Sequence, residues 1–214
     1  MSLDIVRLEN QLMKSNSFIL TDKEAGACAI VDPASEEADR EINYIERNHL
    51  TLDYIIVTHA HADHCWGVNT LKEKYPEARV ICCEDKFSKR EIMLFFRMWH
   101  EDENYRFEMI PSDIVPKEND ELEWHGHQMK FVMTPGHSCG SMCIDIDGLL
   151  FTGDTIMPFA PYFNGRGSNK EEWLKSIDKI CAMYNDKTKI YPGHGGVVTL
   201  EEWKADKKWT DIRK

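Results

Sequence analysis

The 214-residue chain lacks the features that would place it in a membrane or on a nucleic acid. No apolar run approaches the ~18 residues that a membrane-spanning helix requires. The N-terminus has neither a basic start nor a long apolar segment, so no signal peptide is expected. The net charge is −11 and no basic block is longer than Lys207-Lys208, which argues against a phosphate-binding surface. We therefore expect a cytoplasmic protein that binds neither nucleic acid nor membrane.

The chain also lacks a CxxC pair and a recognisable disulfide framework. Its seven cysteines cannot all pair within the chain, and several lie in strand-like runs, as Cys28 does in 27–31. Buried, reduced thiols are the favoured interpretation. The hydrophobic fraction of 42% is sufficient for a real core, and the length fits one sizeable α/β or α+β domain.

Strand-like runs alternate with helical patterns early in the chain, and a second set of strands follows. The predicted strands are 17–20, 28–31, 54–58, 79–83, 122–124, 128–133, 142–146, 149–152 and 189–191. Helices are predicted over about 36–48 and about 65–74, and two more after capping boxes formed by Ser168 with Glu171 and by Thr199 with Glu202. A helical insertion is expected at about 84–121. Its apolar part, 87–99, is interpreted as a lid over a pocket, a contact in a homo-oligomer, or core.

The most informative segment is His59-Ala60-His61-Ala62-Asp63-His64, which directly follows the apolar run 54–58. Three of the nine histidines and one aspartate therefore fall on a single short loop. Imidazole and carboxylate are ligands suited to zinc, iron or manganese, and ordinary packing does not require such a cluster. The segment predicts a metal or catalytic site.

Three later segments share one organisation, in which an apolar strand is followed by glycine and then by a ligand-type residue. They lead to His137, Asp154 and His194. Glycine allows a sharp turn, so the side chain can point into the cleft where the strands end. Because ligands on loops over a rigid sheet can converge, these residues and the first cluster predict one metal site. The remaining histidines are interpreted as surface or structural residues: His49, His100, His125 and His127.

The segment 58–64, followed by His137, Asp154 and His194, resembles the metallo-β-lactamase superfamily, and all five signature segments match in order and context. The resemblance implies a four-layer αβ/βα sandwich in a single domain spanning 1–214. It implies two divalent ions, with zinc favoured and iron or manganese as alternatives. It also implies ligand roles: one metal on His59, His61 and His137, the other on Asp63, His64 and His194, and Asp154 bridging both.

The pair Asp63-His64, the segment 151–155 and Gly165-Arg166 resemble the glyoxalase II branch of that superfamily. The chain differs from this branch in two places. It has Gly167-Ser168 where an aspartate is common, and it ends about twenty residues beyond His194, without the long C-terminal helical domain that helps to bind glutathione. We therefore expect a substrate other than a glutathione thioester.

The predicted reaction is hydrolysis of a small, anionic ester, thioester or lactone. Two divalent ions lower the pKa of bound water from about 15.7 to roughly 7, so a hydroxide that bridges them would act as the nucleophile. Asp63 would be catalytic, orienting this hydroxide or moving its proton. Tyr162 and Arg166, in the loop beyond the bridging Asp154, are the predicted substrate contacts.

Three other functions stay open. Persulfide dioxygenases of the same superfamily resemble the first histidine cluster but bind a single iron, which would make the chain an oxidoreductase. A nuclease or phosphodiesterase is disfavoured by the acidic charge balance. The last alternative is a metal-stabilised interaction protein with 87–99 as its contact surface, which is disfavoured because seven ligands leave room for bridging solvent.

Replacing His59 or Asp154 with alanine is expected to abolish metal content and activity together, because each substitution removes a predicted ligand. Elemental analysis and hydrolysis assays on the same samples measure the two properties. A His59→Ala protein that is active without metal would refute the prediction.

Overall fold

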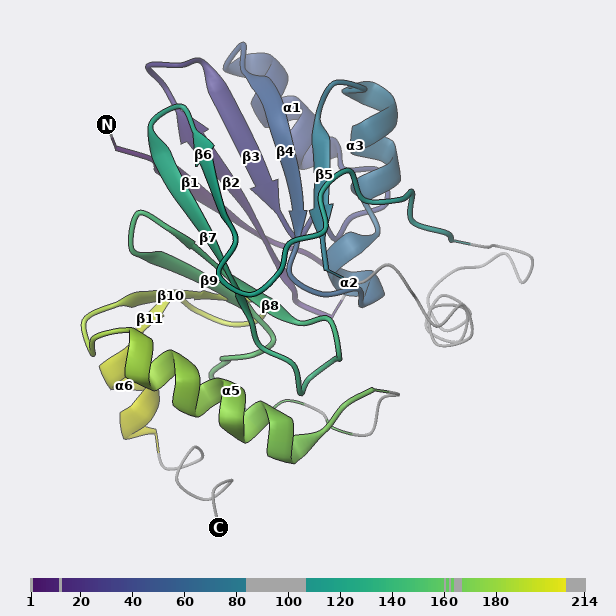
Figure 1. Cartoon of the computed structure of the whole chain (residues 1–214). Coiled ribbons are helices and arrows are strands. Elements are labelled where there is room, and N and C mark those ends of the chain that lie inside the picture. The colour runs from purple at the N-terminus through teal and green to yellow at the C-terminus, as the bar shows by residue number, and fades with distance from the viewer. Residues whose placement is uncertain are drawn as a thin grey trace. The chain divides into compact units, whose positions relative to one another are not determined.

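The computed structural model describes residues 2–11, 13–83, 107–159, 161, 163 and 167–206. It contains two compact units, residues 2–115 and 116–214, and each is built on one β-sheet (Figure 1). The expectation of a single domain over 1–214 stays a prediction. Within the expected helical insertion, the described part 107–120 contains no helix, and the apolar part 87–99 lies outside the described residues.

The sheet of the N-terminal unit has the strand order β1-β2-β3-β4-β5. Its elements are β1 (Asp4–Glu9), β2 (Asn16–Asp22), β3 (Ala27–Val31), α1 (Asp39–Arg47), β4 (Thr51–Val57), α2 (Ala62–Cys65), α3 (Val68–Lys74) and β5 (Arg79–Cys82). The first three strands pair antiparallel, whereas β3, β4 and β5 pair parallel. The C-terminal ends of β3 and β4 therefore meet at one edge of the sheet, and Asp32 and Thr58 follow them there.

The core of this unit forms where α1 and α3 pack on the sheet (Figure 1). Ile30 and Ile55 of the sheet, Ile45 of α1 and Leu71 of α3 are all almost fully buried. All four predicted strands of this unit are present, and β1 is an additional edge strand. Its apolar residues are only half-buried, and Ile5 and Val6 are adjacent, so alternation of apolar and charged residues covers only 6–9 and the signal in the sequence is weak.

The predicted helix over 65–74 is divided in the structure into α2 and α3, which meet at Gly67. The Gly67 N–H donates to the Pro33 carbonyl oxygen at 2.9 Å. A Cβ atom at this position would lie 2.5 Å from the Ser35 carbonyl oxygen. The chain therefore passes so close to the loop after β3 that a side chain at Gly67 has no room. The apolar periodicity that predicted one helix over 65–74 does not reveal this contact.

The sheet of the C-terminal unit has the strand order β11-β10-β9-β8-β7-β6. Its elements are β6 (Glu121–Trp124), β7 (His127–Met133), β8 (Met142–Ile146), β9 (Leu149–Gly153), α5 (Lys170–Met183), β10 (Lys189–Pro192), β11 (Val198–Thr199) and α6 (Leu200–Ala205). Only β9 and β10 pair parallel, so the turns after these strands share one edge. The strands predicted here are all present, and the short β11 is an addition. Trp173 and Ile177 of α5 and Trp203 of α6 pack on Val132 and Ile190 of the sheet.

The two predicted helix caps have different outcomes. The capping box of Thr199 and Glu202 at the start of α6 is confirmed. The prediction for α5 is wrong, because its cap is Asn169, whose Oδ1 accepts hydrogen bonds from the N–H groups of Glu171 at 2.9 Å and Glu172 at 3.1 Å. The Ser168 hydroxyl instead donates to the Phe163 carbonyl. Serine and asparagine are equally good caps, so the pattern alone does not separate two adjacent candidates.

Among the described residues, no helix is both long and apolar enough to cross a membrane. The seven cysteines, all within the described residues, form no disulfide, and Cys28, Cys65, Cys82 and Cys143 are buried as expected, whereas Cys139 is exposed. The cytoplasmic location and the absence of a nucleic-acid partner stay predictions.

Gly136→Ala is expected to destabilise the fold by about 2–4 kcal/mol, combining left-handed backbone strain with overpacking. Gly136 has a φ of +139°, and a Cβ there would lie 2.3 Å from the Trp173 backbone. Gly148→Ala is the matched control, since its φ is +84° but nothing lies within 4 Å of the added Cβ. This control is expected to cost only about 1–2 kcal/mol. Urea unfolding measures both, and equal losses would contradict the role given to the Trp173 contact.

Candidate metal centre

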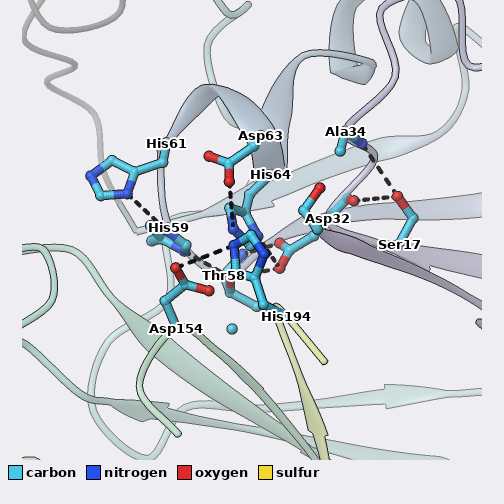
Figure 2. A network of polar contacts seen from close by, with 12 residues as sticks. Ser17, Asp32, Ala34, Thr58, His59, His61, Asp63, His64, Asp154 and His194 are labelled. Carbon is cyan, nitrogen blue, oxygen red and sulfur yellow. Dashed lines mark hydrogen bonds and ion pairs between the residues drawn. The ribbon is translucent and has the colours of Figure 1, made fainter. Parts of the chain in front are cut away.

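The first histidine cluster lies at the C-terminal end of β4, in the N-terminal unit (Figure 2). Thr58 and His59 follow the strand, and α2 begins at Ala62, so Asp63 and His64 lie in its single turn. The exposed fractions are 1% for His59, 7% for Asp63 and 0% for His64. Burial of three ionisable side chains within six residues is unusual for a loop and requires polar partners.

The four predicted ligands of this unit are one another's polar neighbours and lie close together. Nε2 of His59 lies 3.1 Å from Nδ1 of His61, and the ring centroids of His59 and His64 are 4.2 Å apart. Nε2 of His64 lies 3.7 Å from Oδ2 of Asp63. Three imidazoles and one carboxylate therefore present nitrogen and oxygen atoms to a common space at the end of β4.

Asp32 organises this cluster, and the sequence interpretation missed it (Figure 2). Its side chain is 2% exposed and accepts hydrogen bonds from the Thr58 N–H at 2.7 Å and the Thr58 hydroxyl at 2.8 Å. Its Oδ2 also lies 3.0 Å from Nδ1 of His64. With the Nδ1 proton directed at this carboxylate, Nε2 of His64 is left as a ligand atom. Asp32 comes after the apolar strand β3, just as His59 comes after the apolar strand β4. This similarity of position is the sequence signal that could have identified Asp32.

The C-terminal unit brings together the other three predicted ligands. His137 follows β7, Asp154 follows β9 and His194 follows β10, and their exposed fractions are 6%, 7% and 8%. Oδ2 of Asp154 lies 3.5 Å from Nε2 of His137 and 3.6 Å from Nε2 of His194. One carboxylate oxygen thus faces two imidazole nitrogens.

The long helix α5 holds the loop that carries His137. The Ser176 hydroxyl donates to the Pro135 carbonyl at 2.7 Å, and the Lys179 ammonium donates to the Met133 carbonyl. At the start of the helix, the Asn169 N–H donates to the Gly136 carbonyl at 2.7 Å. Three donors on one helix therefore fix the backbone that directs His137.

Parallel pairing of β9 and β10 brings the other two residues side by side. Pro192 pairs with Gly153, and the Gly193 N–H donates to the Gly153 carbonyl at 2.8 Å. Asp154 directly follows Gly153, and His194 directly follows Gly193. Their proximity is thus a direct consequence of strand register.

The spacing of the ligand atoms tests whether a metal fits. Two atoms about 2.1 Å from one tetrahedral ion lie about 3.4 Å apart, whereas a hydrogen bond would bring them to about 2.7–3.2 Å. The distances are 3.5 Å and 3.6 Å around Asp154 and 3.7 Å between Asp63 and His64. These three separations match ligands around an ion better than hydrogen-bonded pairs, whereas the His59 and His61 nitrogens, 3.1 Å apart, lie at hydrogen-bond distance. The nitrogen and carboxylate donors suit zinc, iron or manganese.

Buried cysteine does not add a competing ligand in the C-terminal unit. Burial raises the pKa of the Cys143 thiol to about 11, so it stays protonated at neutral pH. Its Sγ lies 3.6 Å from the Thr134 hydroxyl, in the layer beneath the loops. None of the described groups that could hold a metal ion contains Cys143, which leaves the histidines and aspartates as the donors.

Among the described residues, the histidines and aspartates in groups that could hold a metal ion are the seven predicted ligands: His59, His61, Asp63, His64, His137, Asp154 and His194. Their individual roles stay predictions. The predicted substrate contacts, Tyr162 and Arg166, lie outside the described residues. His127 is a buried structural histidine, and its Nδ1 lies 2.5 Å from Oδ2 of Asp147.

Comparison with known proteins agrees with this geometry. Residues 11–194 match the family model described as the metallo-β-lactamase superfamily. A hydroxyacylglutathione hydrolase 1 from Vibrio vulnificus is 33% identical over 91% of this chain and 67% of that protein. A probable polyketide biosynthesis zinc-dependent hydrolase, BaeB, from Bacillus velezensis is 27% identical over 88% of this chain and 76% of its own length.

Solved structures show the same fold. The BLEG-1 B3 metallo-β-lactamase has a TM-score of 0.80 at 21% identity and covers 96% of this chain and 99% of its own. ETHE1 from Myxococcus xanthus has a TM-score of 0.77 at 21% identity, covering 94% and 82%. The predicted fold class, an α/β sandwich of the metallo-β-lactamase type, is therefore confirmed. The family match, the relatives and the donor groups together support a metal-dependent hydrolase.

Asp32→Asn is expected to weaken zinc binding by about 10–100-fold, because the amide removes the charge and an acceptor that orient His64. Asp147→Asn is the matched control, since it alters a similar histidine–carboxylate contact away from the predicted ligands. Competition with a chromophoric chelator measures both affinities. Wild-type zinc affinity in Asp32→Asn, or an equal loss in the control, would contradict the assignment.

Proposed function

Because this chain belongs to the metallo-β-lactamase superfamily, we propose that it is a binuclear metal-dependent hydrolase of a small, anionic ester, thioester or lactone. The observation that carries the proposal is the pair of buried clusters, in which histidine nitrogens and aspartate oxygens have the spacing of metal ligands. The relative named as a zinc-dependent hydrolase supports zinc as the metal.

In this proposal the seven residues hold two ions. His59, His61 and His137 bind one, Asp63, His64 and His194 bind the other, and Asp154 bridges them. Asp154 suits the bridging role because one of its oxygens already faces two imidazole nitrogens. A second aspartate, Asp63, provides the other negative charge.

The charge balance of this centre selects the substrate. Two divalent ions contribute +4, and the two aspartates offset −2 while the histidines stay neutral. The remaining positive charge at the proposed metal centre favours binding of an anionic group there, although the chain as a whole has a net charge of −11. When bound, such ions lower the pKa of coordinated water to about 7 and polarise a carbonyl oxygen.

The protein's own groups position the reacting atoms. Asp32 keeps His64 in the tautomer that presents Nε2, and Thr58 joins this carboxylate to the start of the cluster. Asp63 is 7% exposed, and its Oδ2 lies 3.7 Å from Nε2 of His64, so in this proposal it is the group that accepts and returns a proton. Burial of both clusters limits competing water.

Elemental analysis of protein purified without added metal, followed by a panel of thioesters, lactones and phosphodiesters, tests the proposal. We expect about two zinc ions per chain and hydrolysis of a thioester or lactone. A chelator is expected to remove the activity and added zinc to restore it. One iron per chain with oxygen consumption would instead assign the chain to the oxidoreductases, and phosphodiester cleavage alone would reject the carbonyl substrates.

A further inference from the structure

Phe159 is a large apolar side chain exposed beside a proposed metal ligand. Its exposed fraction is 48%, and its ring centroid lies 6.1 Å from that of His194. Single exposed apolar residues are common on protein surfaces and carry no meaning alone. The position of Phe159 next to His194, and the way its loop is held, set it apart.

Three consecutive carbonyl groups before Phe159 are fixed by buried donors. The indole N–H of Trp173 donates to the Thr155 carbonyl at 2.8 Å, and that of Trp203 donates to the Met157 carbonyl at 2.8 Å. Between them, the Thr152 hydroxyl donates to the Ile156 carbonyl at 2.9 Å. The backbone leading to Phe159 is thus rigid, so the exposed ring is presented at a defined place.

The turn after His194 abuts the same loop. Gly195 has a φ of +85°, and a Cβ there would lie 2.5 Å from Cγ of Pro158. Pro158, which directly precedes Phe159, therefore lies against the residue that follows the proposed ligand. Val197, 40% exposed, adds a second apolar side chain on this turn.

We propose that Phe159 is a specificity-determining residue that contacts the apolar, uncharged acyl part of the substrate. This inference rests on the proposed function, in which the ions hold the carbonyl or carboxylate oxygens. Hydrocarbon that extends from an atom held near His194 reaches a rigid aromatic surface instead of water, and this contact favours acyl groups longer than acetyl. Rigid aromatic side chains give contact area at little cost in conformational entropy.

The test compares thioesters that share one leaving group and carry acetyl, butyryl or hexanoyl chains. In the zinc-loaded protein, kcat/KM is expected to rise by about two- to fourfold per methylene group that contacts the ring. Phe159→Ala is expected to flatten this dependence, and Phe159→Leu to retain part of it. Met183→Ala is the matched control, because Met183 is 40% exposed at the end of α5, and it should keep the wild-type dependence.

A second readout does not require turnover. Calorimetry measures the affinity of acetate, butyrate and hexanoate for the zinc-loaded protein, and the same chain-length dependence and its loss in Phe159→Ala are expected. If these carboxylates bind in that way but no thioester is cleaved, the hydrolase proposal fails and the Phe159 contact stands. If thioesters are cleaved but the chain-length dependence is absent, or survives in Phe159→Ala, the Phe159 inference is overturned and the hydrolase stands.

Discussion

The first cluster depends on the contacts that the buried carboxylate of Asp32 makes with Thr58 and His64. A carboxylate that is 2% exposed is tolerated only when its oxygens accept hydrogen bonds, and Thr58 provides two of them. These bonds join the end of β3 to the end of β4, and the same carboxylate orients His64. Parallel pairing of β3 and β4 makes this possible, because it brings both strand ends to one edge.

The C-terminal unit reaches the same rigidity by another route. The loops of two proposed ligands, His137 and Asp154, are held through backbone carbonyls, which accept hydrogen bonds from side chains of α5 and α6. The third, His194, is positioned by the pairing of β10 with β9. Trp173 and Trp203 combine core packing with a directional indole N–H, so the packing of the helices and the shape of the loops are coupled. We therefore expect a substitution of Trp173 or Trp203 to alter both the packing of the helices and the shape of the loop after Asp154.

The apolar core of the C-terminal unit also supports the loop that carries the exposed Phe159. The loop that leads from Asp154 to Phe159 is fixed by the same indoles that complete the core. The proposed ligand Asp154 and the exposed ring of Phe159 thus depend on one set of buried donors. Charge at the metal ions and hydrocarbon at the ring would recognise opposite ends of one amphiphilic substrate.

Local patterns carried the successful predictions. The strands preceding His59, His137, Asp154 and His194 are short apolar runs, and their signal depends only on neighbouring residues. Predictions from local patterns failed where the structure depends on a contact with a residue distant in the sequence, or where two adjacent residues were equally good candidates for a helix cap. The division of the predicted helix at Gly67 depends on a backbone contact with Pro33, and the choice between Ser168 and Asn169 as a cap depends on which oxygen reaches the N–H groups.

The amino-acid sequence by itself determined the family resemblance, the chemical types of the ligands and the strand ends that carry them, because each is written in contiguous residues. Only the tertiary structure decided that Asp32 orients His64, that α5 holds the His137 loop, and that Phe159 stays exposed beside His194. These contacts join residues far apart along the chain. Their existence follows from strand pairing and helix packing, which bring these distant residues into contact.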